Sequence, residues 1–360
     1  MNLRMELRTL TPVHVGSGNK LTSTADFVVA GNRVIVVHFE RIIANLPRDV
    51  PYSEILSGGV GEVLSKYRLN AEDFKRYEME LFGQRRRISA ISEHIKQGNK
   101  PYIPGSSVKG AIRTAVLWYF LRDNREILHR TLGNLLQKAS RMYGSRKKEL
   151  KKQADDEIQC EIFGKTPHED IFRALKVSDS SNFRRLQCIS VSVLNAPRLP
   201  PMFVEGIPAG ETASLDISLD ECLMKENMKK WSGKVRELEF EEVQEQVNEF
   251  SKEMLSAIER RFSSLSNRTR NCIRMLRREV KEAEESGGMV LNIGWGGGFL
   301  SKTLGRLLLH EEMFERLRQS LGIGRSPRTR RISENFPKTL RVTERGDLLG
   351  WVKLQEMGGD

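Results

Sequence analysis

Strand-like and helix-like segments follow one another along this chain without a regular alternation. Apolar residues alternate with polar ones over 3–7, and 27–39 holds two β-rich runs around an Asn-containing turn. Apolar residues at helical spacing recur in 108–121 and again in 221–285. A doubly wound parallel sheet needs strands and helices in strict succession. The mixture therefore predicts an α+β fold with split βαβ units of the ferredoxin-like type.

The remaining segments are assigned from the same two periods, with turn residues as their boundaries. Helices are expected over 52–82, 138–152, 221–285 and 302–321. Strands are expected over 174–177, 186–193, 289–293, 339–342 and 348–354, with a hairpin over 202–219 that turns at 209–210. A length of 360 residues suggests about two domains. The Pro-rich stretch 197–201 is the candidate junction, so we expect domains at 1–196 and 197–360, the second with a helical insertion at 221–285.

The charge balance favours a polyanionic partner. The chain has 59 Lys and Arg against 47 Asp and Glu, a formal net charge of +12, while 39% hydrophobic residues exclude wholesale disorder. Such an excess is typical of nucleic-acid binders, whereas a basic surface kept only for solubility is the alternative. Cationic runs at 85–87, 138–152 and 325–331 point the same way.

Several classes of protein and site are not indicated. Apolar stretches are too short to span a membrane, and the first residues lack the apolar core of a signal peptide, so a cytoplasmic protein without a membrane partner is expected. The four cysteines form no C-x-x-C pair. We therefore expect neither a metal site nor a cofactor.

The first candidate site is the run HVGSG. Gly16, Ser17 and Gly18 permit backbone amides to approach a ligand such as an RNA phosphate, although a simple tight turn is the alternative. His14 is a candidate for stacking on a base, or else a packing residue.

The second candidate site is the run YIPGSSVKGAIR. Gly105 is followed by Ser106 or Ser107 as the N-cap of a helix, and unpaired amides at a helix start favour an anion. Lys109 and Arg113 are four residues apart and so share a helix face. Together these residues predict a phosphate clamp, with an ordinary capped helix and solvated cations as the alternative.

The third candidate site is the run GWGGGFLSKT. It is no Walker A loop, because Ser301 stands where the second glycine is needed, and Phe299 replaces the third glycine of a dinucleotide fingerprint. An amide-rich loop with Trp295 available for stacking suits single-stranded RNA. The candidate RNA contacts here are Gly296, Gly297, Gly298, Phe299 and Lys302.

These motifs, together with LKVSDS, FVEGIPAGE and FPKTLRV, resemble the RAMP superfamily of CRISPR proteins. Their order is most similar to that of the head-end (fifth) subunits of type III-A Csm effector complexes. The resemblance implies RNA-recognition-type, ferredoxin-like domains that bind CRISPR RNA toward the 3′ end of the guide, with Lys338 of FPKTLRV among the contacts. It also implies target RNA, the other Csm subunits and host ribonucleases as partners, and a non-catalytic role in CRISPR RNA maturation and antiviral defence.

Two alternatives remain open. Asp26 lies in a region that broadly corresponds to the aspartate loop of related RNA-cutting subunits, so a metal-dependent endoribonuclease that uses Asp26 is one. The surrounding residues, TADFVV, do not reproduce that loop. The other is an assembly scaffold, in which the charged helices of 221–285 mainly meet protein.

Overall fold

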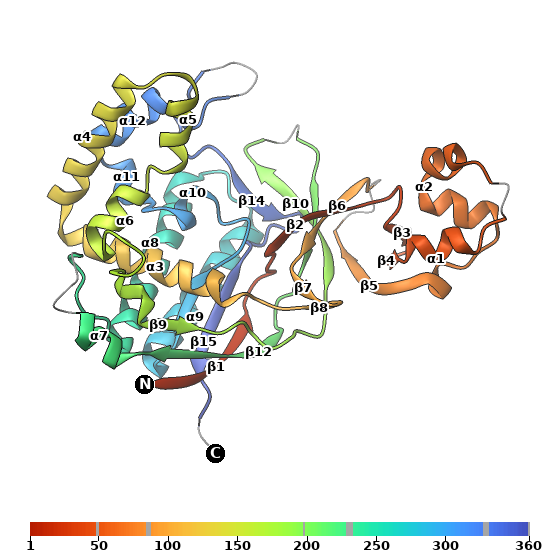
Figure 1. The fold of residues 1–360 in the computed structure, drawn as a ribbon, viewed down its shortest axis with the longest axis horizontal. Helices are drawn as coiled ribbons and strands as arrows, with labels where there is room; N and C mark the ends of the chain where they lie inside the picture. Colours follow the sequence, from red (N-terminus) through yellow and green to blue (C-terminus); the bar gives the residue numbers. More distant parts are fainter. Residues whose placement is uncertain (48–49, 84–87, 197–198, 228–232, 327–330, 359–360) are drawn as a thin grey trace.

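The computed structural model describes residues 1–47, 50–83, 88–196, 199–227, 233–326 and 331–358 (Figure 1). The strands are β1 (Asn2–Thr9), β2 (Gly16–Thr22), β3 (Phe27–Ala30), β4 (Arg33–Val37), β5 (Lys75–Phe82), β6 (Ala90–His94), β7 (Lys96–Gln97), β8 (Lys100–Pro101), β9 (Leu175–Val177), β10 (Gln187–Leu194), β11 (Met202–Gly206), β12 (Thr212–Leu219), β13 (Met289–Asn292), β14 (Leu340–Thr343) and β15 (Trp351–Glu356). The helices are α1 (Phe39–Ala44), α2 (Tyr52–Lys66), α3 (Gly105–Asp123), α4 (Arg125–Arg141), α5 (Gly144–Lys152), α6 (Asp156–Phe163), α7 (Glu221–Asn227), α8 (Phe240–Arg261), α9 (Asn267–Ser286), α10 (Gly298–Lys302), α11 (Arg306–Leu309) and α12 (Glu312–Leu321), with 3-10 turns η1 (Ala71–Phe74) and η2 (Ile171–Arg173).

The first sheet has the strand order β13-β15-β1-β12-β9. Within it β15, β1, β12 and β9 are antiparallel neighbours, which is the 4-1-3-2 order of a ferredoxin-like sheet, and β13 is added at the edge. The expected ferredoxin-like α+β fold is confirmed in this sheet.

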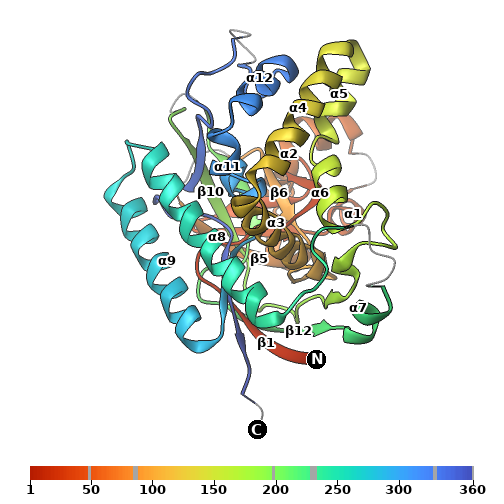
Figure 2. The same ribbon diagram turned by 90° about the vertical axis from the view of Figure 1, so that its left-hand side faces the viewer.

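Sequence periodicity explains how this sheet and its helices form. In β12 every second residue is buried, including Leu215 and Ile217, as expected for a strand with one covered face. In α8 the expected apolar stripe from Val243 to Ile258 is buried. α9 is capped at its start by Ser266, whose Oγ accepts from the Thr269 backbone N–H at 3.1 Å, and at its end by the left-handed Gly287. α8 and α9 lie side by side (Figure 2).

The second sheet is mixed, with the order β2-β6-β11-β10-β5-β4-β3 and with β14 also pairing with β10. β5 is parallel to β10, and β6 is parallel to β11. At one end of the molecule, α1 and α2 cover β3 and β4 with a small hydrophobic cluster of their own (Figure 1).

Three predicted helices are wrong in extent. The helix expected over 138–152 is interrupted by the extended residues Met142 and Tyr143, which separate α4 from α5. The helix expected over 52–82 ends at Lys66, because RYEMELF alternates and buries Met79 and Leu81 in strand β5. The helix expected over 302–321 is divided into α10, α11 and α12. The expected hairpin over 27–39 and the strands β9, β10 and β13 are confirmed.

The expected hairpin over 202–219 is also wrong, although both of its strands form. β11 pairs with β10 and β6 in the second sheet, whereas β12 pairs with β1 and β9 in the first. The chain changes sheets at Ile207, which forms an isolated bridge with Val13. The expected closing strands are divided in the same way, since β14 belongs to the second sheet and β15 to the first.

Both sheets therefore combine strands from either side of the proposed junction. The division into 1–196 and 197–360 stays a prediction, and residues 197–198 lie outside the described residues. None of the described helices is both long enough and apolar enough to cross a bilayer.

Candidate nucleic-acid interface

The first and third glycine motifs meet in space. The backbone N–H of Trp295 donates to the His14 carbonyl at 2.8 Å. The side-chain rings of the two residues are in T-shaped contact, with their centroids 5.8 Å apart. Gly294 has a φ of +65°, and a Cβ there would lie 2.4 Å from the His14 carbonyl oxygen. Glycine is therefore required for this close approach. Segments about 280 residues apart in sequence thus form one continuous surface.

The exposed part of this surface is the loop that begins β2. Gly16, Ser17 and Gly18 are all exposed, and nothing lies within 4 Å of a Cβ built on Gly18. The Ser17 hydroxyl donates to Glu93 at 3.1 Å, which holds the loop against β6. These residues are accessible to a ligand, as the sequence predicted.

The glycines of the third motif are more enclosed. Gly296 is buried against Leu349, whereas Gly297 is half-buried against Ser301. Gly298 is half-buried and opens α10. Packing explains the small residues at 296 and 297, while only 298 has open space at its Cβ position.

The start of α3 differs from the predicted cap. The helix begins at Gly105, and neither Ser106 nor Ser107 caps it, because the Gly105 N–H donates to the Asp179 carboxylate at 2.9 Å. A Cβ on Gly105 would lie 2.2 Å from the Val177 carbonyl oxygen, so this glycine allows α3 to touch the end of β9. The protein's own carboxylate therefore occupies one of the amides predicted to bind a phosphate.

Arg113 does not join the predicted clamp. Its guanidinium bonds to Asp170 at 2.8 Å and to Gln159 at 2.8 Å, and it lies over the Phe163 ring at 4.3 Å. Lys109 is half-buried, and burial lowers its pKa. The structure thus leaves Lys109 with Ser106, which is exposed, and Ser107, which is half-buried, as the side chains of the clamp.

The other aromatic and basic candidates have separate environments. Phe299 packs against Phe336 at 4.7 Å and Phe314 at 5.8 Å, so its ring belongs to an aromatic cluster. The Lys302 ammonium donates to the Asn292 carbonyl at 3.3 Å, and loss of solvation lowers its pKa to about 8.

Lys338 is exposed beside the start of β14. Trp295, which the sequence offered as a stacking residue, is itself covered by the Arg341 guanidinium at 4.7 Å. A base that stacked on this ring would have to share or displace that guanidinium.

A buried histidine pair lies directly under the exposed loop. His14 Nδ1 donates to the Glu205 carbonyl at 2.6 Å, and His94 Nδ1 accepts from the Val15 N–H at 3.1 Å. Burial lowers the pKa of His14, and burial lowers the pKa of His94 to about 3. Both rings are therefore neutral near pH 7, and His14 positions the loop without offering a cation to a phosphate.

Sequence reasoning missed the ionic network beside these histidines. The Glu205 side chain is fully buried and accepts from the Tyr77 hydroxyl at 2.6 Å and from the Lys96 ammonium. Lys96 also pairs with Glu93 at 3.1 Å. Burial and the Glu205 charge raise the pKa of Tyr77, which stays protonated. A glutamate inside the apolar run MFVEGIP was the one signal that could have found this network.

Asp26 has a structural contact. Its carboxylate accepts from the Thr22 N–H at 2.7 Å and from the Thr22 hydroxyl at 2.9 Å, which closes the turn between β2 and β3. Within the described ranges no three His, Cys, Asp or Glu side chains gather as metal ligands. Asp26 is therefore not part of such a group in that part of the chain, whereas metal-dependent nuclease sites use several converging carboxylates.

The cationic runs are only partly described. Helix α5 has no buried residue, and Lys138 at the end of α4 pairs with Glu157 at 2.6 Å. Arg85, Arg86, Arg87, Arg328 and Arg330 lie outside the described residues.

Comparison with known proteins gives a consistent picture. The family model of the RAMP superfamily matches residues 6–301. The curated CRISPR system Cms protein Csm5 of Methanocaldococcus jannaschii is 25% identical, over 98% of this chain and 88% of the relative. The protein of the same name from Mycobacterium tuberculosis is 25% identical over 60% of this chain and 66% of its own length.

Two solved structures share the fold. One chain from a cryo-EM structure of a Csm-crRNA-target RNA ternary complex in a type III-A CRISPR-Cas system superposes with a TM-score of 0.76 and 27% identity, over 99% of this chain and all of the other. The crystal structure of T. onnurineus Csm5 gives a TM-score of 0.67 and 25% identity, over 96% of this chain and 99% of the other.

Proposed function

The chain belongs to the RAMP superfamily and is a Csm5-like subunit, and from this we propose that it binds CRISPR RNA within a type III-A Csm effector complex without cutting it. The observation that carries the proposal is the junction of the first and third glycine motifs, which presents the exposed loop Gly16–Gly18. Exposed amides and small side chains suit the RNA backbone, which every guide sequence shares.

The rest of the surface supports the same ligand. Lys109 at the start of α3 and the exposed Lys338 supply positive charge. His94 connects the glycine loop with the start of α3, because its Nδ1 accepts from the Val15 N–H and its Nε2 donates to the Tyr102 carbonyl at 3.1 Å, just before α3. Phosphate contacts of this kind fix the position of the RNA and read no bases.

We place the subunit toward the 3′ end of the guide, where it supports CRISPR RNA maturation and target-RNA binding. Its partners there are the other Csm subunits and host ribonucleases, and its setting is the cytoplasm. The similarity to a chain from a Csm complex with CRISPR RNA and target RNA supports membership of such a complex and RNA as a ligand. The net charge of +12 supports a polyanionic partner.

The test is the affinity of the purified Csm complex for CRISPR RNA at about 50 mM and about 200 mM salt. Lys109→Ala should weaken binding about threefold to tenfold and reduce the salt slope by about one phosphate contact. Lys176→Ala is the matched control, because Lys176 is exposed on β9 and pairs with Asp220 at 2.9 Å. An affinity for CRISPR RNA that changes neither with salt concentration nor with Lys109→Ala would contradict the proposal.

A further inference from the structure

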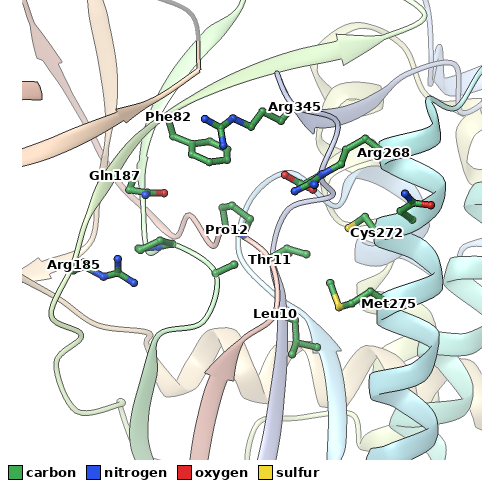
Figure 3. A pocket seen from close by; sticks show the side chains of 14 residues that line it. Leu10, Thr11, Pro12, Phe82, Arg185, Gln187, Arg268, Cys272, Met275 and Arg345 are labelled. Atoms are coloured by element: carbon green, nitrogen blue, oxygen red, sulfur yellow. The ribbon is translucent and has the colours of Figure 1, made fainter. Parts of the chain in front are cut away.

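A pocket lies between the two sheets, on residues that the glycine motifs do not use (Figure 3). Its volume is about 460 Å³. The floor is the connection from β1 toward β2, with Leu10 and Pro12, and one wall is the first turns of α9, with Cys272 and Met275. This size falls within the range of small-molecule sites.

The upper wall of the pocket carries a stacked pair. The Arg345 guanidinium lies over the Phe82 ring at 4.3 Å (Figure 3). Arg345 is exposed and lines the pocket, so a ligand in the pocket can reach its guanidinium. Guanidinium planes and aromatic rings are the surfaces on which proteins stack nucleobases.

Two further arginines line the pocket, and each is oriented by a carboxylate. Arg268 donates through Nε to Asp347 at 2.8 Å, and Arg185 donates through Nε to Glu211 at 2.7 Å. Each guanidinium has five N–H donors, so donors remain for an anion. The carboxylates fix the arginines in place and thereby lower the entropy lost on binding.

The pocket has an excess of one positive charge. Of the three arginines that line it, Arg268 pairs with Asp347 and Arg185 pairs with Glu211, while the Arg345 guanidinium lies over the Phe82 ring. An apolar floor with a stacking pair and fixed guanidinium groups fits a ligand that has both a planar ring and a phosphate. An acidic peptide offers the negative charge but no planar base.

We propose that this pocket binds one nucleotide, with the base stacked on the Arg345–Phe82 pair and the phosphate bound by Arg268. The nucleotide is either free or part of an RNA strand, because the recognising chemistry is the same. The site is separate from the glycine-loop surface and does not depend on it.

The experiment is a calorimetric titration of the purified full chain with AMP, adenosine, inorganic phosphate and a five-nucleotide RNA. Arg345→Ala and Arg268→Ala should each weaken AMP binding about tenfold. Arg277→Ala is the matched control on α9, because it also removes one arginine and one ion pair, with Glu259 at 2.6 Å. It should leave AMP binding unchanged, and thermal melting of each variant checks folding.

Adenosine and phosphate should each bind more weakly than AMP, because each makes only half of the contacts. If AMP binds as tightly as the five-nucleotide RNA, the ligand is a free nucleotide. If the RNA binds more tightly than AMP, the ligand is a nucleotide within a strand. Both results support the proposal. The proposal would be overturned if phosphate bound as tightly as AMP, or if the folded Arg345→Ala variant bound AMP with unchanged affinity. Lys109→Ala keeps the two sites apart, since it should weaken CRISPR RNA binding and leave AMP binding intact.

Discussion

The two sheets bury different kinds of side chain. The strands of the first sheet bury apolar residues such as Met5 and Leu7, and the polar residues that they bury, Thr9 and Asn292, are neutral. In the second sheet Glu205 is fully buried as part of an ionic network with Lys96. Loss of one partner of a buried charge is costly, so Lys96 and Tyr77 have to stay beside Glu205. His14, which precedes the exposed loop, bonds to the backbone carbonyl of the same Glu205, so the candidate RNA surface lies next to that network.

The largest expected effect is that of Glu205→Ala. The change leaves the Lys96 ammonium and the Tyr77 hydroxyl without their buried acceptor, so the free energy of unfolding should fall by about 3–5 kcal/mol. Urea denaturation measures this loss. The double variant Glu205→Leu with Lys96→Met should recover part of it, because both charges are then removed. A loss below about 1 kcal/mol would mean that the network contributes no more than a surface ion pair.

In the first sheet we expect Leu7→Ala to cost about 3 kcal/mol through the cavity it leaves, since Leu7 is fully buried. Leu7→Met should cost less than about 1.5 kcal/mol, because volume is nearly conserved. The same denaturation assay compares the two. If Leu7→Met were as damaging as Leu7→Ala, shape and not lost apolar contact would dominate this core.

The pH dependence should also separate the two sheets. Burial holds the pKa of His94 at about 3, against 6.5 for an unperturbed histidine, so below 6.5 the unfolded chain takes up a proton that the folded chain refuses. The stability contributed by neutral His94 is complete above pH 6.5 and is lost as the pH falls toward 3. At pH 5 the loss should be about 2 kcal/mol.

Denaturation at several pH values tests this expectation with His94→Asn, which has no group that titrates in this range. The variant should be less stable at pH 7 and should show a shallower loss on acidification. Parallel curves for the two proteins would show that His94 does not cause the acid sensitivity.

The smallest expected effect concerns the turn that connects β2 and β3, the two edge strands of the second sheet. Asp26→Ala removes two hydrogen bonds to Thr22 and should cost about 1 kcal/mol, whereas Asp26→Asn, which keeps an acceptor, should cost less. Neither change should alter RNA integrity when the protein is incubated with RNA and Mg²⁺. Cleavage by the wild type that Asp26→Ala abolishes would instead favour the endoribonuclease alternative.

Local features of the sequence were predictable, and the partners of each feature were not. The apolar stripe of α8 and the alternation of β12 depend on neighbours within the same segment, so their periods were sufficient. The residues around Gly210 look like an ordinary hairpin turn, yet β12 pairs with β1 from the opposite end of the chain. The same turn residues suit a hairpin and a connection between two sheets. Only the pairing of each strand with distant segments decides which of the two forms.

The same limit applies to the candidate site. Lys109 and Arg113 share a helix face as expected, but Asp170 comes from a separate segment and pairs with Arg113 alone. The residues around Lys109 and Arg113 do not indicate which of the two side chains remains available to a phosphate. The contact between His14 and Trp295 was likewise invisible, although both motifs were singled out as candidates.

The pairing of β1 with β15 has a consequence for synthesis. β1 is synthesised long before β15, and one of its edges is covered only when Val352–Glu356 pair with Met5–Thr9. Until then a ribosome-bound chain exposes an unpaired strand edge, which is a template for aggregation. Contacts of such long sequence separation also form slowly. A nascent chain of this kind is therefore a natural client for chaperones, and its yield should depend on how long translation takes to reach β15.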